Sequence, residues 1–143
     1  MNEVRFDELS AIADRFKDTA DSARDELRKF HEELATSMLN TVQANILGMG
    51  IKDIHGKVRG WQEKYVGSYG GYAAVRPRSS TDAEKANKSA SSPGAITNYL
   101  ENGTIKYAGF YFYRLSKRME YAKAKRAAEK LRDSIVSRLN GGE

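Results

Sequence analysis

The stretch AITNYLENGTIKY, residues 95–107, decides how the second half of this chain folds. β-Branched and aromatic residues flank Asn102-Gly103, a dipeptide typical of two-residue hairpin turns. The pattern therefore predicts a strand and a turn over residues 95–108. The residues after the turn either begin a return strand or extend the loop; they are Thr104, Ile105 and Tyr107.

The sequence upstream predicts one long helix over residues 1–46. Apolar or small residues recur there at spacings of three or four, which places them on one helical stripe. About 40 residues at 1.5 Å each give a rod of roughly 60 Å, which is longer than a core of this size can cover. Either the helix breaks within residues 17–23, or one end projects and packs on another subunit. The stripe comprises Leu9, Ile12, Phe16, Ala20, Ala23, Leu27, Phe30, Leu34, Met38 and Val42.

Residues 47–77 are predicted to form a linker followed by a β-hairpin. Gly70-Gly71 suits a two-residue turn, because both positions tolerate positive φ. Pro77 cannot donate a ladder hydrogen bond and should end the second strand. The first strand is marked by Trp61, Tyr65 and Val66, and the second by Tyr72, Ala74 and Arg76.

Residues 78–94 are small and polar, and we expect a flexible loop in which DAEKA forms at most one helical turn. Residues 109–140 then predict a C-terminal helix with an apolar face and a basic face. The apolar face comprises Phe112, Leu115, Met119, Ala122, Ala127, Leu131, Ile135 and Leu139. The basic face comprises Lys117, Arg118, Lys123, Lys125, Arg126, Lys130, Arg132 and Arg138. The expected fold class is α+β in a single domain over residues 1–143: a long N-terminal helix, a small antiparallel sheet of three to four strands, and a C-terminal helix.

The composition of the 143 residues is that of a globular chain with a polar surface, and it contains no cysteine. Disulfides and thiolate metal sites are therefore excluded, and a reducing compartment is expected. No apolar run approaches the roughly 20 residues of a membrane helix. The N-terminus lacks the basic and then apolar plan of a signal peptide, so we expect the chain to be made in a cytoplasm.

Charge is distributed unevenly along the chain, whose formal net charge is +5. Residues 1–46 hold ten acids and six bases, whereas residues 105–143 hold four acids and ten bases. Such asymmetry favours either contact with DNA or head-to-tail pairing between copies of the chain. The alternative is that two charged helices simply have different solvated faces.

Little in the sequence indicates catalysis. The two histidines, His31 and His55, lie in different elements, and His31 sits beside acids on a helix face that we expect to be solvated. Glu63 and Glu101 lie on or near predicted strands and could face each other, but surface carboxylates are the simpler interpretation. The glycines of the predicted hairpin do not precede a helix, so they form no phosphate loop. We therefore predict no enzyme activity, no catalytic residues, no cofactor and no metal site.

Five aromatic residues gather just before and within the start of the C-terminal helix. Two or three of them are expected in the core. The others suit a protein interface or base stacking on single-stranded nucleic acid, in that order. They are Tyr107, Phe110, Tyr111, Phe112 and Tyr113.

The order of elements and two short motifs resemble the small neck or tail-completion proteins of long-tailed bacteriophages. Tyr99-Leu100-Glu101-Asn102-Gly103-Thr104 is similar to that family's aromatic-Val-Glu-x-Gly-Thr motif. The stretch HGKVRGW, residues 55–61, resembles the stretch before its first hairpin strand, with Gly56, Val58 and Arg59 at matching places.

The resemblance implies a structural role in the virion, at the neck or tail, after assembly in the bacterial host cytoplasm. Such proteins join heads to tails as part of the ring stack between portal and tail tube. The implied partners are copies of this chain in a ring and adjacent neck and tail proteins, namely a connector or stopper, or a tail terminator. DNA passing through the lumen is a further implied contact, and no membrane is involved. The alternatives are a small basic nucleic-acid-binding protein that uses the C-terminal helix, and an assembly chaperone that never enters the particle.

Overall fold

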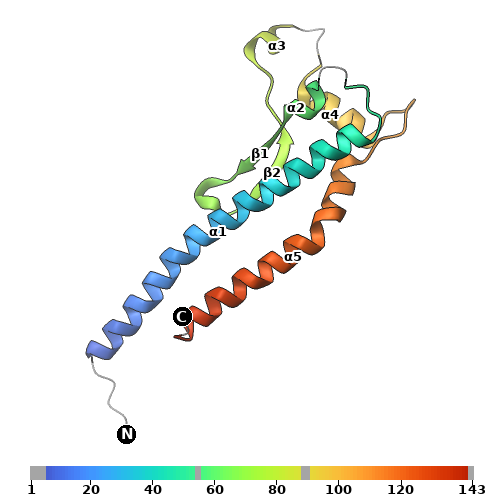
Figure 1. Cartoon of the computed structure of the whole chain (residues 1–143). Helices are drawn as coiled ribbons and strands as arrows, with labels where there is room; N and C mark the ends of the chain where they lie inside the picture. The colour runs from blue at the N-terminus through green and yellow to red at the C-terminus, as the bar shows by residue number, and fades with distance from the viewer. Residues whose placement is uncertain (1–5, 54–55, 88–90, 142–143) are drawn as a thin grey trace.

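The computed structural model describes residues 6–53, 56–87 and 91–141, with side chains from Ser10 onward. Its elements form an elongated molecule in which two long helices lie side by side and the remaining elements gather around one end (Figure 1). They are α1 (Phe6–Gly48), α2 (Lys57–Trp61), β1 (Gln62–Val66), the 3-10 turn η1 (Ser68–Gly70), β2 (Ala73–Pro77), α3 (Asp82–Ala86), α4 (Pro93–Asn102) and α5 (Phe112–Leu139).

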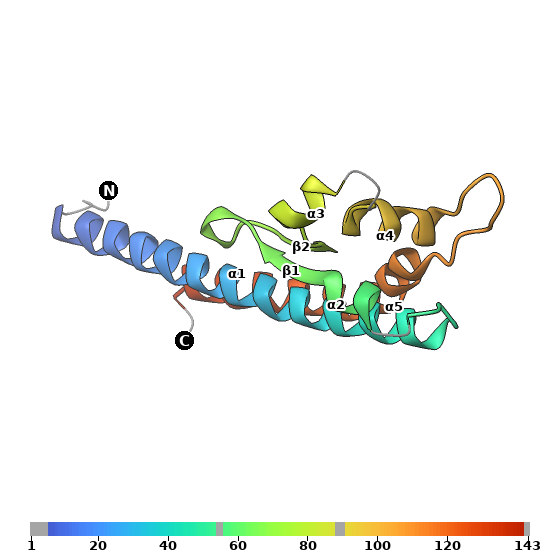
Figure 2. The same cartoon turned by 90° about the horizontal axis from the view of Figure 1, so that it is seen from above.

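The predicted N-terminal helix is confirmed, and it ends two residues later than expected. α1 is continuous over 43 residues, so the break within residues 17–23, one of the two possibilities left open, is absent. At 1.5 Å per residue its length is roughly 65 Å. α5 returns antiparallel beside it, and the N-terminal end of α1 extends beyond the end of α5 (Figures 1 and 2). This end is the projecting end that the sequence offered as the alternative to a break.

The sheet has two strands among the described residues, not three to four. β1 and β2 pair antiparallel from Gln62↔Pro77 to Val66↔Ala73, and β2 ends at Pro77 as predicted. The predicted two-residue turn is wrong, because η1 lies within a longer connection over residues 67–72. The reason is contact with α1: a Cβ on Gly70 would lie 2.7 Å from the Cα of Arg28, so the turn is pressed against the long helix.

The strand and turn predicted over residues 95–108 are also wrong, because most of that stretch is helix α4. The side chain of Ser92 caps the helix by accepting a hydrogen bond from the amide of Ala95, and Pro93 occupies the first turn. Asn102-Gly103 ends the helix, with Gly103 at a φ of 83°. The residues after it extend a loop, which is the second of the two outcomes left open.

Residues 78–87, the described first part of the predicted loop, contain more local structure than their composition suggested. DAEKA does form the predicted single turn, α3, and Thr81 and Glu84 cap it reciprocally. Arg78 also makes two hydrogen bonds to Glu84, of 2.7 and 2.9 Å, and lowers the pKa of Glu84 to about 2, with the amide of Thr81 adding to the effect. Residues 78–87 are therefore held by local polar contacts.

The core lies where the C-terminal half of α1 meets the small elements. Its buried apolar side chains are Val42, Ile46, Val58 and Phe112, and Ile96 and Leu100 of α4 pack against them. Buried Gln62 of β1 makes hydrogen bonds to three other elements, α2, α4 and α5. Its amide donates to the carbonyl of Val58 at 2.9 Å and to Thr97 Oγ1 at 3.1 Å, and its oxygen accepts from the hydroxyl of Tyr113.

The predicted apolar face of α5 is rotated from the face that contacts α1. Met119 is 57% exposed and Ala122 is exposed, whereas polar Ser116 is fully buried. The rotation of α5 about its own axis is set by polar side chains that pair with side chains of α1. Ser116 accepts from Asn45 at 2.7 Å, Glu120 accepts from Ser37 and Thr41 at 2.8 and 2.6 Å, and Arg138 pairs with Glu26.

We predict that Gly103→Ala destabilises the fold by about 1–3 kcal/mol, because positive φ strains a residue with a side chain and the space is filled. The new Cβ would lie 2.5 Å from the amide nitrogen of Gly109 and from the carbonyl oxygen of Tyr107. Gly48→Ala is the matched control, since a Cβ there meets nothing within 4 Å. Urea unfolding followed by circular dichroism measures both; equal stability of the two variants would contradict this account of the junction.

Candidate interaction surfaces

The start of α5 is held by a carboxylate from another helix. Tyr111, the residue before α5, provides no side-chain cap. Instead buried Glu101, in the last turn of α4, accepts hydrogen bonds from the amides of Tyr113 at 2.8 Å and Arg114 at 3.1 Å. These are two of the amides that a helix N-terminus leaves without partners, and a negative charge is favoured there. Glu101 is therefore a structural clamp between α4 and α5.

The other residues considered for chemistry lie apart from one another. Glu63 is exposed and lies 3.8 Å from Arg76, so it does not face Glu101, and Glu101 is not the surface carboxylate that we expected. His31 is half-buried rather than solvated, and its Nδ1 donates to the carbonyl of Gly70 at 2.6 Å, which fixes the hairpin turn on α1. His55 lies outside the described residues. Within the described ranges, no group of three or more histidines, cysteines and acids is placed to hold a metal ion.

The aromatic cluster divides between core and surface. Phe112 is fully buried, and Tyr113 is half-buried with its pKa raised by burial. Tyr107, Phe110 and Tyr111 are 74%, 39% and 42% exposed. The prediction that two or three aromatics enter the core is confirmed, and three remain on the surface.

One side of α1 carries a row of acids, which we call the acidic stripe. Its members are exposed, and no ion pair to another described residue is seen for any of them. Their spacings of four, three, four and seven put them on one side of the helix, roughly opposite the side that contacts α5 through Glu26, Ser37 and Thr41. The acidic stripe is Asp14, Asp18, Asp21, Asp25 and Glu32.

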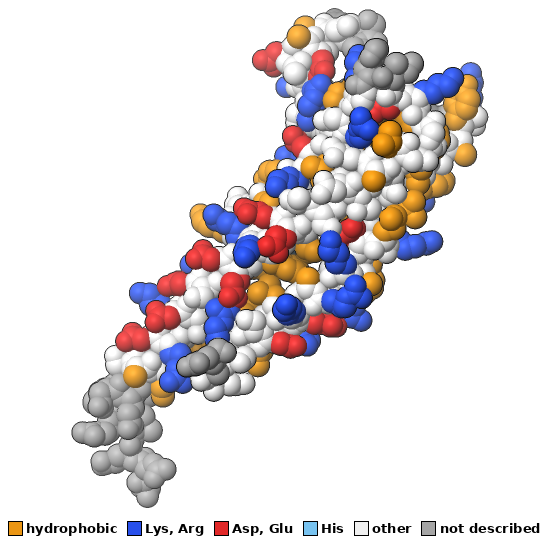
Figure 3. Space-filling view, viewed as in Figure 1, with side chains coloured by type: hydrophobic (Ala, Val, Ile, Leu, Met, Phe, Trp, Pro, Cys, Tyr) orange, Lys and Arg blue, Asp and Glu red, His pale blue; other side chains and the backbone are white. Residues whose placement is uncertain are grey.

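α5 carries the opposite charge over much of its exposed surface. Five exposed cations there make no ion pair or hydrogen bond with any residue that the structure describes. In the space-filling view, Lys and Arg side chains lie over α5 and acidic side chains follow the outer edge of α1 (Figure 3). Three members of the predicted basic face, Lys123, Arg132 and Arg138, have partners. The basic face that remains is Lys117, Arg118, Lys125, Arg126 and Lys130.

Rows of like charge on one helix destabilise it slightly. Both rows lie on outer sides of the α1–α5 pair, and no ion pair joins either row to another described residue. The sequence had indicated an acidic and a basic end, but it did not show that the two helices pack together and still leave these rows outside.

Comparisons with protein-family models, with curated proteins and with solved structures give no match for this chain. Among the described residues, none of the helices combines the length and apolar character needed to span a membrane.

Replacement of Glu101 tests the clamp. We predict that Glu101→Ala costs about 1–3 kcal/mol of unfolding free energy, because it leaves the amides of Tyr113 and Arg114 without acceptors at a partly buried helix start. Glu63→Ala is the control; its exposed pair with Arg76 predicts a loss below about 1 kcal/mol. Urea unfolding measures both, and a Glu101 variant as stable as the Glu63 variant would show that α5 does not need this carboxylate.

Proposed function

We propose that this chain is a structural subunit of a bacteriophage virion that acts at the head–tail neck as a head-tail joining, or tail-completion, protein and assembles into a ring. It has no enzyme activity in this role. The observation that carries the proposal is the separation of charge: the acidic stripe and the basic face lie on different outer sides of one two-helix unit.

Ring assembly uses such a separation. In a ring each subunit contacts the next through two different surfaces, which must complement each other. The acidic stripe of one copy and the basic face of the next meet this requirement, and neither row has a partner among the described residues of its own chain.

The neck assignment is supported by the resemblance of the two short motifs. In this chain the motif residues serve the junctions of the fold. Glu101 clamps α5, Gly103 allows a close backbone approach, and Val58 lies in the core. The proposed partners are copies of this chain, a connector or stopper protein, and a tail terminator. DNA passing through the lumen is a further contact for the basic face.

Deletion of the gene tests the role. Electron microscopy of lysates from the phage or prophage that carries it should show DNA-filled heads and finished tails that are separate from one another. Normal, infectious particles would remove the neck assignment. Purified virions should also contain the protein, and its absence from them would favour an assembly chaperone.

Complementation of the deletion then tests the charge argument. Asp18→Lys with Asp25→Lys should fail to restore joined particles, whereas Glu63→Lys with Asp82→Lys, an equal change of charge on exposed acids outside α1, should restore them. Adding Lys125→Glu and Lys130→Glu to the first variant should recover joining. Equal complementation by both charge-reversed variants would show that the stripe is not a subunit contact.

The second candidate function is binding of nucleic acid by α5, and the unpaired basic face favours it. It predicts duplex binding whose affinity falls steeply with salt, with Lys125→Glu and Lys130→Glu together lowering the slope of log K against log salt by about 2. Fluorescence anisotropy at several salt concentrations measures this. Weak binding at modest salt would exclude nucleic acid as the main partner.

A further inference from the structure

An apolar groove runs between the sheet and α5, and α1 forms its floor. Its volume is about 430 Å³, within the range of pockets that hold small ligands or side chains. Leu34 and Met38 of α1 lie at the bottom, Val75 of β2 on one wall, and Tyr121 and Ala124 of α5 on the other. Tyr72 and Tyr121 are 55% and 65% exposed, so the groove is open to solvent.

The groove also offers polar groups. Glu120 lines it, and hydrogen bonds from Thr41 and Ser37 together with the charge of Lys123 lower the pKa of Glu120, so this carboxylate is ionised at neutral pH. Lys117 lies at the rim. The free edge of β2 adds backbone groups. The hydrogen-bonded pairs Gly67–Tyr72 and Arg78–Trp61 fix which residues of β2 bond to β1. Because hydrogen-bonded and non-hydrogen-bonded positions alternate, Ala73 and Val75 direct their amides and carbonyls away from β1.

A matching projection lies at the end of the molecule. The loop between α4 and α5 turns back on itself, with Gly103 bridged to Ala108, and carries Ile105, Lys106 and Tyr107 at its tip. Ile105 is 107% exposed and Tyr107 74% exposed, and neither amide donates to a backbone oxygen of the described chain. At the base of the tip, the backbones of Gly103 and Gly109 are in close contact, and this contact fixes the position of the tip relative to α5.

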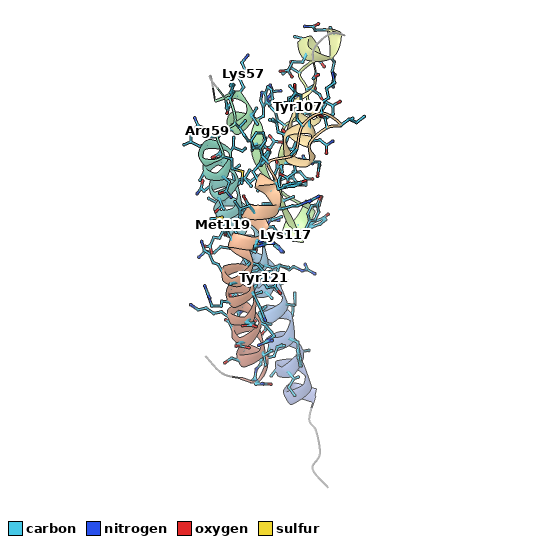
Figure 4. All side chains as sticks on the ribbon, turned by 90° about the vertical axis from the view of Figure 1, so that its right-hand side faces the viewer. Lys57, Arg59, Tyr107, Lys117, Met119 and Tyr121 are labelled. Carbon is cyan, nitrogen blue, oxygen red and sulfur yellow. The ribbon has the colours of Figure 1, made fainter. Side chains whose placement is uncertain are left out.

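The tip cannot fill the groove of its own chain. Tyr107 lies near one end of the molecule, and the groove residues Lys117 and Tyr121 lie further along the long axis (Figure 4). Met38, the groove residue nearest the end of α1, is ten residues before Gly48, or roughly 15 Å along the helix.

We propose that the tip of one copy, Ile105 to Tyr107, docks into this groove of the next copy in the ring. Ile105 and Tyr107 then contact Leu34, Met38 and Tyr121, and Lys106 lies near Glu120. This inference rests on the proposed ring assembly and names the surfaces that make its subunit contact.

The charged rows support a second copy of the chain as the occupant of the groove. Pairing the rows of two copies requires the same displacement along the long axis as docking the tip into the groove. In the α1–α5 pair, Asn45 is level with Ser116 and Thr41 with Glu120, which puts Lys125 level with about residue 36. The middle of the acidic stripe is near Asp21, so laying it on a neighbour's basic face shifts one copy by about 15 residues, or roughly 22 Å. Docking the neighbour's tip into the groove of the shifted copy also requires a shift along the helix axis. That shift is of similar size and in the same direction.

Disulfide trapping tests the contact, and the natural absence of cysteine makes it specific. Full-length Ile105→Cys and Ala124→Cys chains are mixed in a glutathione redox buffer. The expected result is at least tenfold more mixed dimer than from Ile105→Cys with Ser137→Cys, an exposed position on α5 away from the groove. Excess cysteine-free chain should reduce the yield, whereas excess cysteine-free chain that carries both Ile105→Asp in the tip and Ala124→Arg in the groove wall should not.

Equal yields from the two cysteine pairs, or equal competition by the two cysteine-free chains, would overturn the proposal. Crosslinking to a different protein in lysate, with none between copies, would also overturn it, because the groove would then have another occupant. The result is separable from the neck role. A specific crosslink together with normal particles after gene deletion would support the contact and exclude the neck role. No specific crosslink together with separate heads and tails would support the neck role and exclude the contact.

Discussion

The carboxylate of Glu101 at the start of α5 is the contact on which the arrangement of this molecule depends. It binds two amides of a helix that has no cap of its own, and it reaches them because Gly103 and Gly109 let the chain pass close to itself. α4 is in turn held in the core by Ile96, Leu100 and the Thr97 contact to Gln62. The position of α4 therefore fixes where α5 begins, and the same turn of chain directs the loop tip outward.

Polar pairing sets the register and rotation of α5 once its start is fixed. Ser116, Glu120 and Arg138 each have a named partner on α1, spread along most of the shared length. Apolar side chains alone would tolerate small slips between two helices, whereas hydrogen bonds at fixed positions do not. Using polar residues inside the pair also turns Met119 outward and leaves the basic face in solvent.

Regular periodicity predicted the large elements well. α1 and α5 follow from helical repeats, the hairpin was predicted from its glycines and the aromatic and β-branched residues beside them, and Pro77 marked the end of β2. The errors fall where short-range chemistry decides. Ser92-Pro93 is a helix start, and Thr81 with Glu84 is a capping pair; both signals were present in the sequence. The roles of Glu101 and of the α5 polar residues depend on partners more than ten residues away, so no local pattern reveals them.

The misassigned stretch is a further observation that agrees with the proposed assembly. Thr104, Ile105 and Tyr107 favour strands, yet in the single chain they form a loop tip with apolar side chains in water. Natural sequences usually agree with their structure at the local level, so such a conflict points to a contact that one chain does not contain. If neighbours meet with the stagger that the charged rows require, a closed ring is possible only when the long axis is inclined to the ring axis. In such a ring, the proposed docking would place each tip over the sheet of the next copy.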